Sequence, residues 1–157
     1  MSKSPFPVRA VNPLVTRDQL VAEVRSWKGT PFHWQASLKG HGCDCRGLIT
    51  GVGRELGLPE AELLAATERT YRKDFRPDLM LERLRAALIP VQQGLPGDVV
   101  AIQIDRTDDG PRHLAMLTTG DRLVHCYGGG PLKKVIEVPI GRSRPIHSFW
   151  TWPSLGG

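Results

Sequence analysis

The sequence contains few cysteines, few aromatic residues and no long apolar run. Its 157 residues include only three cysteines, an odd and small number that argues against a disulfide-stapled scaffold. No stretch approaches the roughly 20 apolar residues of a membrane-spanning helix, so we expect no membrane span. Aromatic residues make up 6% of the chain, and no run of Lys and Arg alternates with them. A nucleic acid is therefore not an expected partner.

The overall composition is that of a soluble globular protein, with 40% hydrophobic and 24% charged residues. We expect an extended, proline-containing N-terminal arm at residues 1–15 and one domain over residues 16–157. The first residues lack the apolar segment of a secretory signal, so we expect cytoplasmic synthesis without one. The net charge of +5 favours an anionic partner such as a cell-envelope polymer, unless it is only a mildly basic surface.

The hydrophobic pattern changes from helical to strand-like spacing near residue 97. Apolar residues recur at helical spacing in 16–29, 44–57, 59–66 and 77–88. Five later segments are short and β-rich: 98–104, 112–118, 122–127, 133–138 and 146–152. This order predicts an α+β fold, with N-terminal helices packed on a C-terminal antiparallel sheet of about five strands. The polar, basic segment 68–76 is expected to be mobile or to face a partner.

Residues 41–57, HGCDCRGLITGVGRELG, carry the main functional signal. They predict a turn that runs into a helix, with Asp44 as N-cap and Gly57 just beyond the end. Cys45 then lies in the first turn, where unpaired backbone N–H groups and the helix dipole stabilise a thiolate. Arg46 adds a cation beside it. These features predict that Cys45 is a nucleophile.

A nucleophilic cysteine needs a base, and the base needs an orienting partner. His113 and His125 lie on consecutive predicted strands joined around residues 119–121. A three-residue loop pairs Ala115 with His125 and places both imidazoles on one sheet face, whereas a two-residue loop places them on opposite faces. With the odd loop, His113 is the expected general base and His125 the group that fixes its tautomer. The backbone N–H of Cys45 is the expected oxyanion donor.

Other interpretations of these residues stay open. A strand histidine is more often structural than catalytic. Four residues have the types of a zinc site: Cys43, Cys45, His113 and His125. Their C-x-C spacing is unlike that of zinc knuckles and leaves the helix-start cysteine unexplained, so we expect no metal and no cofactor. Cys126 alternates to the strand face opposite His125 and is expected to be a core thiol, while Cys43 is either a packed thiol or a redox partner.

Five segments in order, GTPFHW, CDCRGLITGV, LPGDVV, RHLAML and LVHCYGGG, resemble the NlpC-type cysteine peptidases of bacterial cell walls. They are most similar to the versions found in phage and gene-transfer-agent tails. The resemblance covers residues 29–138. It implies a papain-like core and hydrolysis of peptidoglycan stem peptides, commonly at the bond from γ-D-glutamate to the diamino acid.

The resemblance also implies residue roles. By position, Cys45 corresponds to the nucleophile, His113 to the base and His125 to the third residue, while Asp44 matches an Asp that helps to bind the free end of the stem peptide. Four residues in or directly next to these motifs are further candidates for substrate binding: Phe32, Trp34, Gln35 and Arg46.

The chain departs from the family pattern at three of these positions. Arg46 replaces the usual Ser. Phe32 stands where relatives often have a Tyr whose hydroxyl faces the site, and Gln35 replaces a common Gly. The side-chain amide of Gln35 is a candidate substitute for the missing hydroxyl donor.

The first hypothesis is a peptidoglycan-cleaving cysteine endopeptidase carried by a phage tail or tail-like particle, with tail or baseplate proteins as partners and the periplasm or cell wall as its place of action. A second is a structural module that uses the groove for docking, which fits the basic 68–76 segment and the departures at Phe32 and Arg46. A third is a papain-like amidase or acyltransferase on another substrate.

Overall fold

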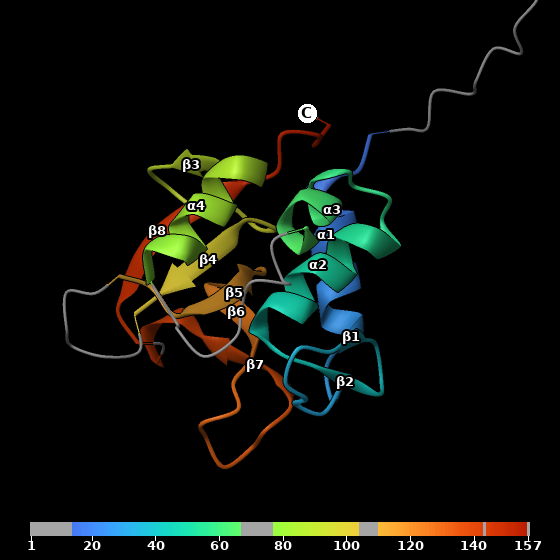
Figure 1. The fold of residues 1–157 in the computed structure, drawn as a ribbon, viewed down its shortest axis with the longest axis vertical. Coiled ribbons are helices and arrows are strands. Elements are labelled where there is room, and N and C mark those ends of the chain that lie inside the picture. Colours follow the sequence, from blue (N-terminus) through green and yellow to red (C-terminus); the bar gives the residue numbers. More distant parts are fainter. Residues whose placement is uncertain (1–13, 67–76, 104–109, 143, 157) are drawn as a thin grey trace, which may run out of the picture.

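The computed structural model describes residues 14–66, 77–103, 110–142 and 144–156 (Figure 1). The helices in these ranges are α1 (Arg17–Ser26), α2 (Cys45–Glu55), α3 (Glu60–Ala65) and α4 (Pro77–Ala87), and none is long and apolar enough to cross a membrane. The predicted segment 68–76 lies outside the described residues, as does the predicted arm apart from its last two residues. Of those two, Val15 forms a parallel bridge with Leu155, so the start of the described chain lies beside its end.

Local signals set the ends of the first two long helices as predicted. The Thr16 hydroxyl accepts from Gln19 N–H at 3.2 Å and the Gln19 side chain accepts from Thr16 N–H at 2.8 Å, which is a complete capping box before α1. Asp44 is the N-cap of α2. Gly29 and Gly57 follow α1 and α2 with φ of +89° and +71°, a backbone region that glycine enters without a steric penalty.

The main sheet is antiparallel and has six strands in the order β3-β8-β4-β5-β6-β7. The five predicted strands correspond to β4 (Val99–Ile102), β5 (His113–Leu117), β6 (Arg122–Cys126), β7 (Val135–Pro139) and β8 (Ile146–Thr151). The prediction missed the edge strand β3 (Ile89–Val91), because Pro90 at its centre breaks the strand pattern and is tolerated only at an edge. It also missed a small hairpin, β1 (Ser37–Leu38) and β2 (Gly42–Cys43), before α2.

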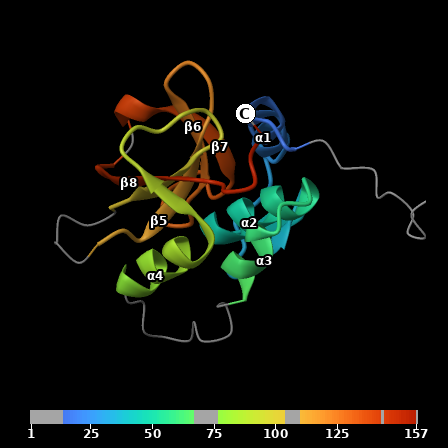
Figure 2. The same ribbon diagram turned by 90° about the horizontal axis from the view of Figure 1, so that it is seen from above.

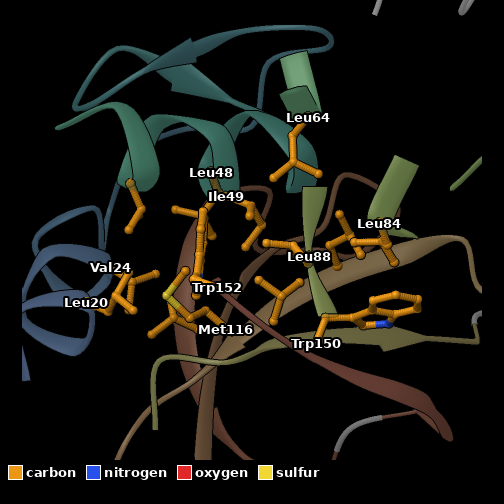
Figure 3. Packing of buried hydrophobic residues seen from close by; sticks show 14 of the residues in the cluster. Leu20, Val24, Leu48, Ile49, Leu64, Leu84, Leu88, Met116, Trp150 and Trp152 are labelled. Carbon is orange, nitrogen blue, oxygen red and sulfur yellow. The ribbon is translucent and has the colours of Figure 1, made fainter. Parts of the chain in front are cut away.

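The helices cover one face of this sheet (Figure 2). Leu48, Ile49 and Val52 of α2 are at most 1% exposed and belong to a core shared with Met116 of β5 and Trp152 (Figure 3). Truncating a side chain as buried as Leu48 to Ala costs about 2–5 kcal/mol. The core therefore fixes α2, and with it the start of that helix, against the middle of the sheet.

An ionic cluster fixes α1 against β7. The Glu137 carboxylate is 8% exposed and accepts from Thr118 at 2.6 Å, Arg25 at 3.1 Å and Lys28 at 3.3 Å. Burial alone would raise the pKa of Glu137, but these three donors outweigh it and lower that pKa. The charged carboxylate thus links α1 and the turn after it to β7 and to Thr118, the residue that follows β5.

Candidate active site

Cys45 is the first residue of α2, and the turn before it is held by Asp44. The Asp44 carboxylate, on a residue only 5% exposed, accepts from Gly47 N–H at 2.7 Å through one oxygen and from Gln35 N–H at 2.9 Å through the other. One side chain therefore caps the helix and attaches the preceding loop to it.

Gly47 allows that loop to approach the helix closely. A Cβ at Gly47 would lie 1.9 Å from the carbonyl oxygen of Ala36, and that same oxygen accepts from Asp44 N–H at 3.2 Å. No residue other than glycine fits without moving the loop or the helix start. The G in the CDCRGL motif is thus explained by backbone contact.

The two predicted histidines lie side by side. Ala115 pairs with His125 across β5 and β6, so the predicted odd loop is confirmed. His113 Nε2 lies 2.7 Å from His125 Nδ1, with the two rings at 73°. Because Nε2 is engaged, Nδ1 is the nitrogen of His113 that remains for a proton from Cys45. A base role requires the tautomer in which His113 Nε2–H donates to His125.

Cys45 and His113 line one open cavity of about 320 Å³ between the helix start and the sheet. The backbone of Leu114, the residue next to His113, lies near enough to the Cys45 thiol to lower its pKa. Phe32 and Trp34 line the same cavity, and Trp34 is 58% exposed. We call this cavity the cleft. It is large enough for part of an extended peptide.

The electrostatics of Cys45 differ from the sequence-based prediction. Burial of the thiol, followed by the neighbouring Asp44 charge, raises the pKa of Cys45 to about 12, although the Leu114 backbone and Arg46 act in the opposite direction. Arg46 thus acts in the predicted direction, but the prediction that Cys45 has a stabilised thiolate is wrong for the resting protein. Desolvation and the adjacent carboxylate outweigh the helix start.

Burial also keeps the histidines neutral. It lowers the pKa of His113 to about 3, with smaller contributions from His125 and Arg144, and lowers that of His125 as well. A neutral thiol and a neutral imidazole that line one cleft form a resting pair, in which His113 can accept a proton without first losing one.

The candidate substrate-binding residues are placed differently from one another. Phe32, Trp34, Asp44 and Arg46 line the cleft. Gln35 is not among the lining residues: its side chain is exposed, and its contribution is the backbone bond to Asp44. Its φ of +59° lies in the left-handed region, where the Gly expected from the family pattern would be unstrained.

Tyr127, which lies two residues after His125, is a site residue that was not predicted from the sequence. Its ring packs edge-to-face on His113, with centroids 5.4 Å apart, and it lines the cleft. It also lines a second cavity of about 260 Å³ on the other side of the histidine pair. The two-residue spacing from His125 was the available signal, because it places both rings on one face.

The other two cysteines belong to the core. Cys43 and Cys126 are both 0% exposed, and the Cys126 thiol donates to the Cys43 carbonyl at 3.3 Å. The pKa of Cys43 is raised by its hydrogen bond to Cys126 and by burial. Within the described ranges, no group of three His, Cys, Asp or Glu side chains could hold a metal ion, so the zinc interpretation gains no support from the geometry.

Comparisons with known proteins give similarity in structure only. No family model and no curated protein matches the sequence. Among solved structures, the NlpC/p60 domain of the peptidoglycan hydrolase SagA is 19% identical, with a TM-score of 0.58 over 87% of this chain and 99% of that domain. NlpC2 from Trichomonas vaginalis is 15% identical, with a TM-score of 0.63 over 93% of this chain and 51% of its own, so this chain spans about half of that protein.

A third similar structure is not an enzyme. RipD from Mycobacterium tuberculosis, described as a non-catalytic NlpC/p60 domain protein adapted to peptidoglycan binding, is 16% identical, with a TM-score of 0.52 over 87% of this chain and 96% of its own. At these identities the comparisons concern the fold. The chain has the papain-like α+β fold of NlpC/p60 domains, with N-terminal helices on a C-terminal antiparallel sheet.

Proposed function

We propose that this protein is a cysteine endopeptidase that cleaves the stem peptides of peptidoglycan. The observation that carries the proposal is the arrangement of Cys45 at a helix start and the His113–His125 pair, with Cys45 and His113 on one peptide-sized cleft. The fold shared with a peptidoglycan hydrolase supports the choice of substrate. The γ-D-glutamyl to diamino acid bond is the proposed cleavage site.

The geometry supports a two-stage acyl transfer. His113 Nδ1 takes the thiol proton as the Cys45 sulfur attacks the peptide carbonyl, and the backbone N–H of Cys45 stabilises the oxyanion. The imidazolium gives its proton to the leaving amine, which leaves a thioester on Cys45. Water then attacks the thioester with His113 again as base, releasing the carboxylic acid product and the thiol. His125 holds the tautomer of His113 throughout.

Purified sacculi and product mass analysis test this proposal. The wild type should release stem-peptide fragments, and Cys45→Ala should release none while keeping its thermal stability. The masses of the fragments identify the bond. If neither protein releases fragments, the endopeptidase proposal fails. If the bond that is hydrolysed is an amide that does not join two amino acids, the protein would instead be an amidase.

A second candidate function is peptidoglycan binding without cleavage. The raised pKa of Cys45 favours it, since a binding module does not need a reactive thiol, and a non-catalytic protein has the same fold. Sedimentation with sacculi separates the two functions. A binding module sediments equally well as wild type and as Cys45→Ala and leaves the sacculi intact.

The particle context is part of the same proposal. A tail or tail-like particle would bring the protein to the cell wall, where its net charge of +5 suits an anionic envelope. Mass spectrometry of particles purified from the source cells should find this chain together with tail proteins, and its absence from such particles would refute this part of the proposal.

A further inference from the structure

His113 lies between two rings. On one side it is hydrogen-bonded to His125 at 2.7 Å, and on the other its ring meets that of Tyr127 at 64°, with centroids 5.4 Å apart. The hydrogen bond fixes which nitrogen faces His125. A swing of the imidazole about the Cα–Cβ bond would break only this one hydrogen bond, unless something fills the other side.

Tyr127 fills that side. Both Tyr127 and His113 line the cleft and also the second cavity behind the histidine pair, so their two rings form the partition between the cavities. Losing the Tyr127 ring would join the two cavities around His113 and give its imidazole room to turn away from Cys45 and meet water.

The chain after Tyr127 is built to keep its ring in place. A Cβ on Gly129 would lie 2.5 Å from the Tyr127 hydroxyl oxygen, and one on Gly128 would lie 2.5 Å from the Phe32 ring. Glycine at both positions therefore lets the backbone pass closely over the two rings. Within the described residues the Tyr127 hydroxyl makes no hydrogen bond, so the fold uses the ring and not the hydroxyl.

We propose that Tyr127 is a positioning residue whose ring closes the partition behind His113 and holds Nδ1 of that imidazole toward Cys45. This inference deepens the proposed function, since it assumes that His113 is the base for Cys45. It assigns no chemistry to the Tyr127 hydroxyl.

The partition also determines the protonation of His113, because burial is the largest cause of its lowered pKa. Charged and titratable groups from every surrounding element line the two cavities. At the start of α2 they are Asp44, Cys45 and Arg46, and on the strands they are Arg112, next to His113, and His125 and Tyr127 on or just after β6. Before β8 they are Arg142 and Arg144. The cations among these groups also oppose a charged imidazole. Opening the partition admits water and raises the pKa of His113 toward its ordinary value.

Alkylation of Cys45 by iodoacetamide, followed by mass spectrometry across pH 4–9, tests the proposal without any peptidoglycan. Tyr127→Phe keeps the ring and should match the wild type within about twofold. Tyr127→Leu removes it and should react about tenfold more slowly at pH 7. Its rate should also fall steeply below pH 6, where the wild-type rate does not, because His113 becomes protonated.

Phe149→Leu is the matched control, since it truncates another half-buried aromatic residue of the sheet that lines neither cavity. Its alkylation profile should match that of the wild type. If Tyr127→Leu does not fold at the assay temperature, Tyr127→Met, which keeps most of the volume without a ring, takes its place with the same expected profile.

Two results would overturn the proposal: a wild-type profile in the Leu or Met variant, or an equal defect in Tyr127→Phe. Stem-peptide hydrolysis separates this inference from the proposed function. If the wild type hydrolyses no stem peptide but the alkylation profiles differ as expected, the endopeptidase proposal fails and the positioning role stands. If hydrolysis occurs, Tyr127→Leu should lower kcat more than it raises KM.

Discussion

Replacing Asp44 tests how the active-site turn is held together. Its carboxylate makes two bonds, to the buried Gly47 N–H and to the Gln35 N–H on an exposed residue. Losing a charge-assisted bond to a buried N–H costs about 2 kcal/mol, and losing one that water can replace costs about 1 kcal/mol. Asp44→Ala should therefore lower the free energy of unfolding by about 3 kcal/mol.

Asp44→Asn separates the cap from the charge. Asn is a good N-cap and can keep an oxygen toward Gly47, so it should lose only about 1 kcal/mol. The Asp44 charge helps to raise the pKa of Cys45, so removing that charge should lower this pKa and speed alkylation at a fixed pH. If Asp44 also binds the free end of the stem peptide, the same variant should raise KM.

Urea denaturation measures the first effect. With a slope of about 2 kcal/mol per molar, the midpoint of Asp44→Ala should fall by about 1.5 M and that of Asp44→Asn by about 0.5 M. Glu62→Gln is the control, because its carboxylate pairs with Arg54 at a fully exposed site, and its midpoint should not move. A midpoint for Asp44→Ala within about 0.3 M of the wild type would refute the argument that this side chain holds the turn.

Three further predictions follow from contacts in the described structure. Gly47→Ala should destabilise the protein by at least about 2 kcal/mol and abolish cleavage, since its Cβ would overlap a carbonyl oxygen. Urea denaturation and sacculus digestion measure the two effects. Gly141→Ala is the control and should show neither effect, because its Cβ meets nothing within 4 Å. His125→Phe should lower kcat about a hundredfold with little change in KM, because His113 loses the partner that fixes its tautomer, and steady-state kinetics on a stem peptide would show it. The pKa of Glu137 is lowered on folding, so the charged carboxylate stabilises the fold above pH 4.5, and this contribution is lost as the pH falls below that value. The thermal stability of Glu137→Gln should therefore depend less on pH between 3 and 6 than that of the wild type.

The fold and the catalytic candidates could be predicted from the sequence because their signals are local or periodic. The cap at Asp44 and the odd loop before His125 each depend on a few neighbouring residues, and both are as predicted. The edge strand β3 could not be found in this way, because three residues around Pro90 have no recognisable alternation.

The errors within the site concern features that depend on the three-dimensional surroundings of a residue and not on its neighbours in sequence. A helix-start position predicts a low pKa for Cys45, but the protein packed around the thiol reverses the direction of the shift. In the sequence, Tyr127 is an aromatic residue at the end of a strand, and only the strand register brings its ring into contact with His113. Gln35 directly follows the GTPFHW segment, yet it is exposed and is not among the residues that line the cleft.

The neutral resting pair changes what must activate Cys45. Burial raises the pKa of the thiol and lowers that of His113, so proton transfer between them without substrate would create two poorly solvated charges. In the transition state for attack, by contrast, the negative charge moves from sulfur to the carbonyl oxygen, where the N–H groups of the helix start can receive it. The imidazolium is then balanced by an oxyanion that the site is able to hold. On this argument the cleft disfavours the free thiolate and favours the transition state. Cys45 should therefore react slowly with small alkylating reagents and rapidly with a substrate that fills the cleft.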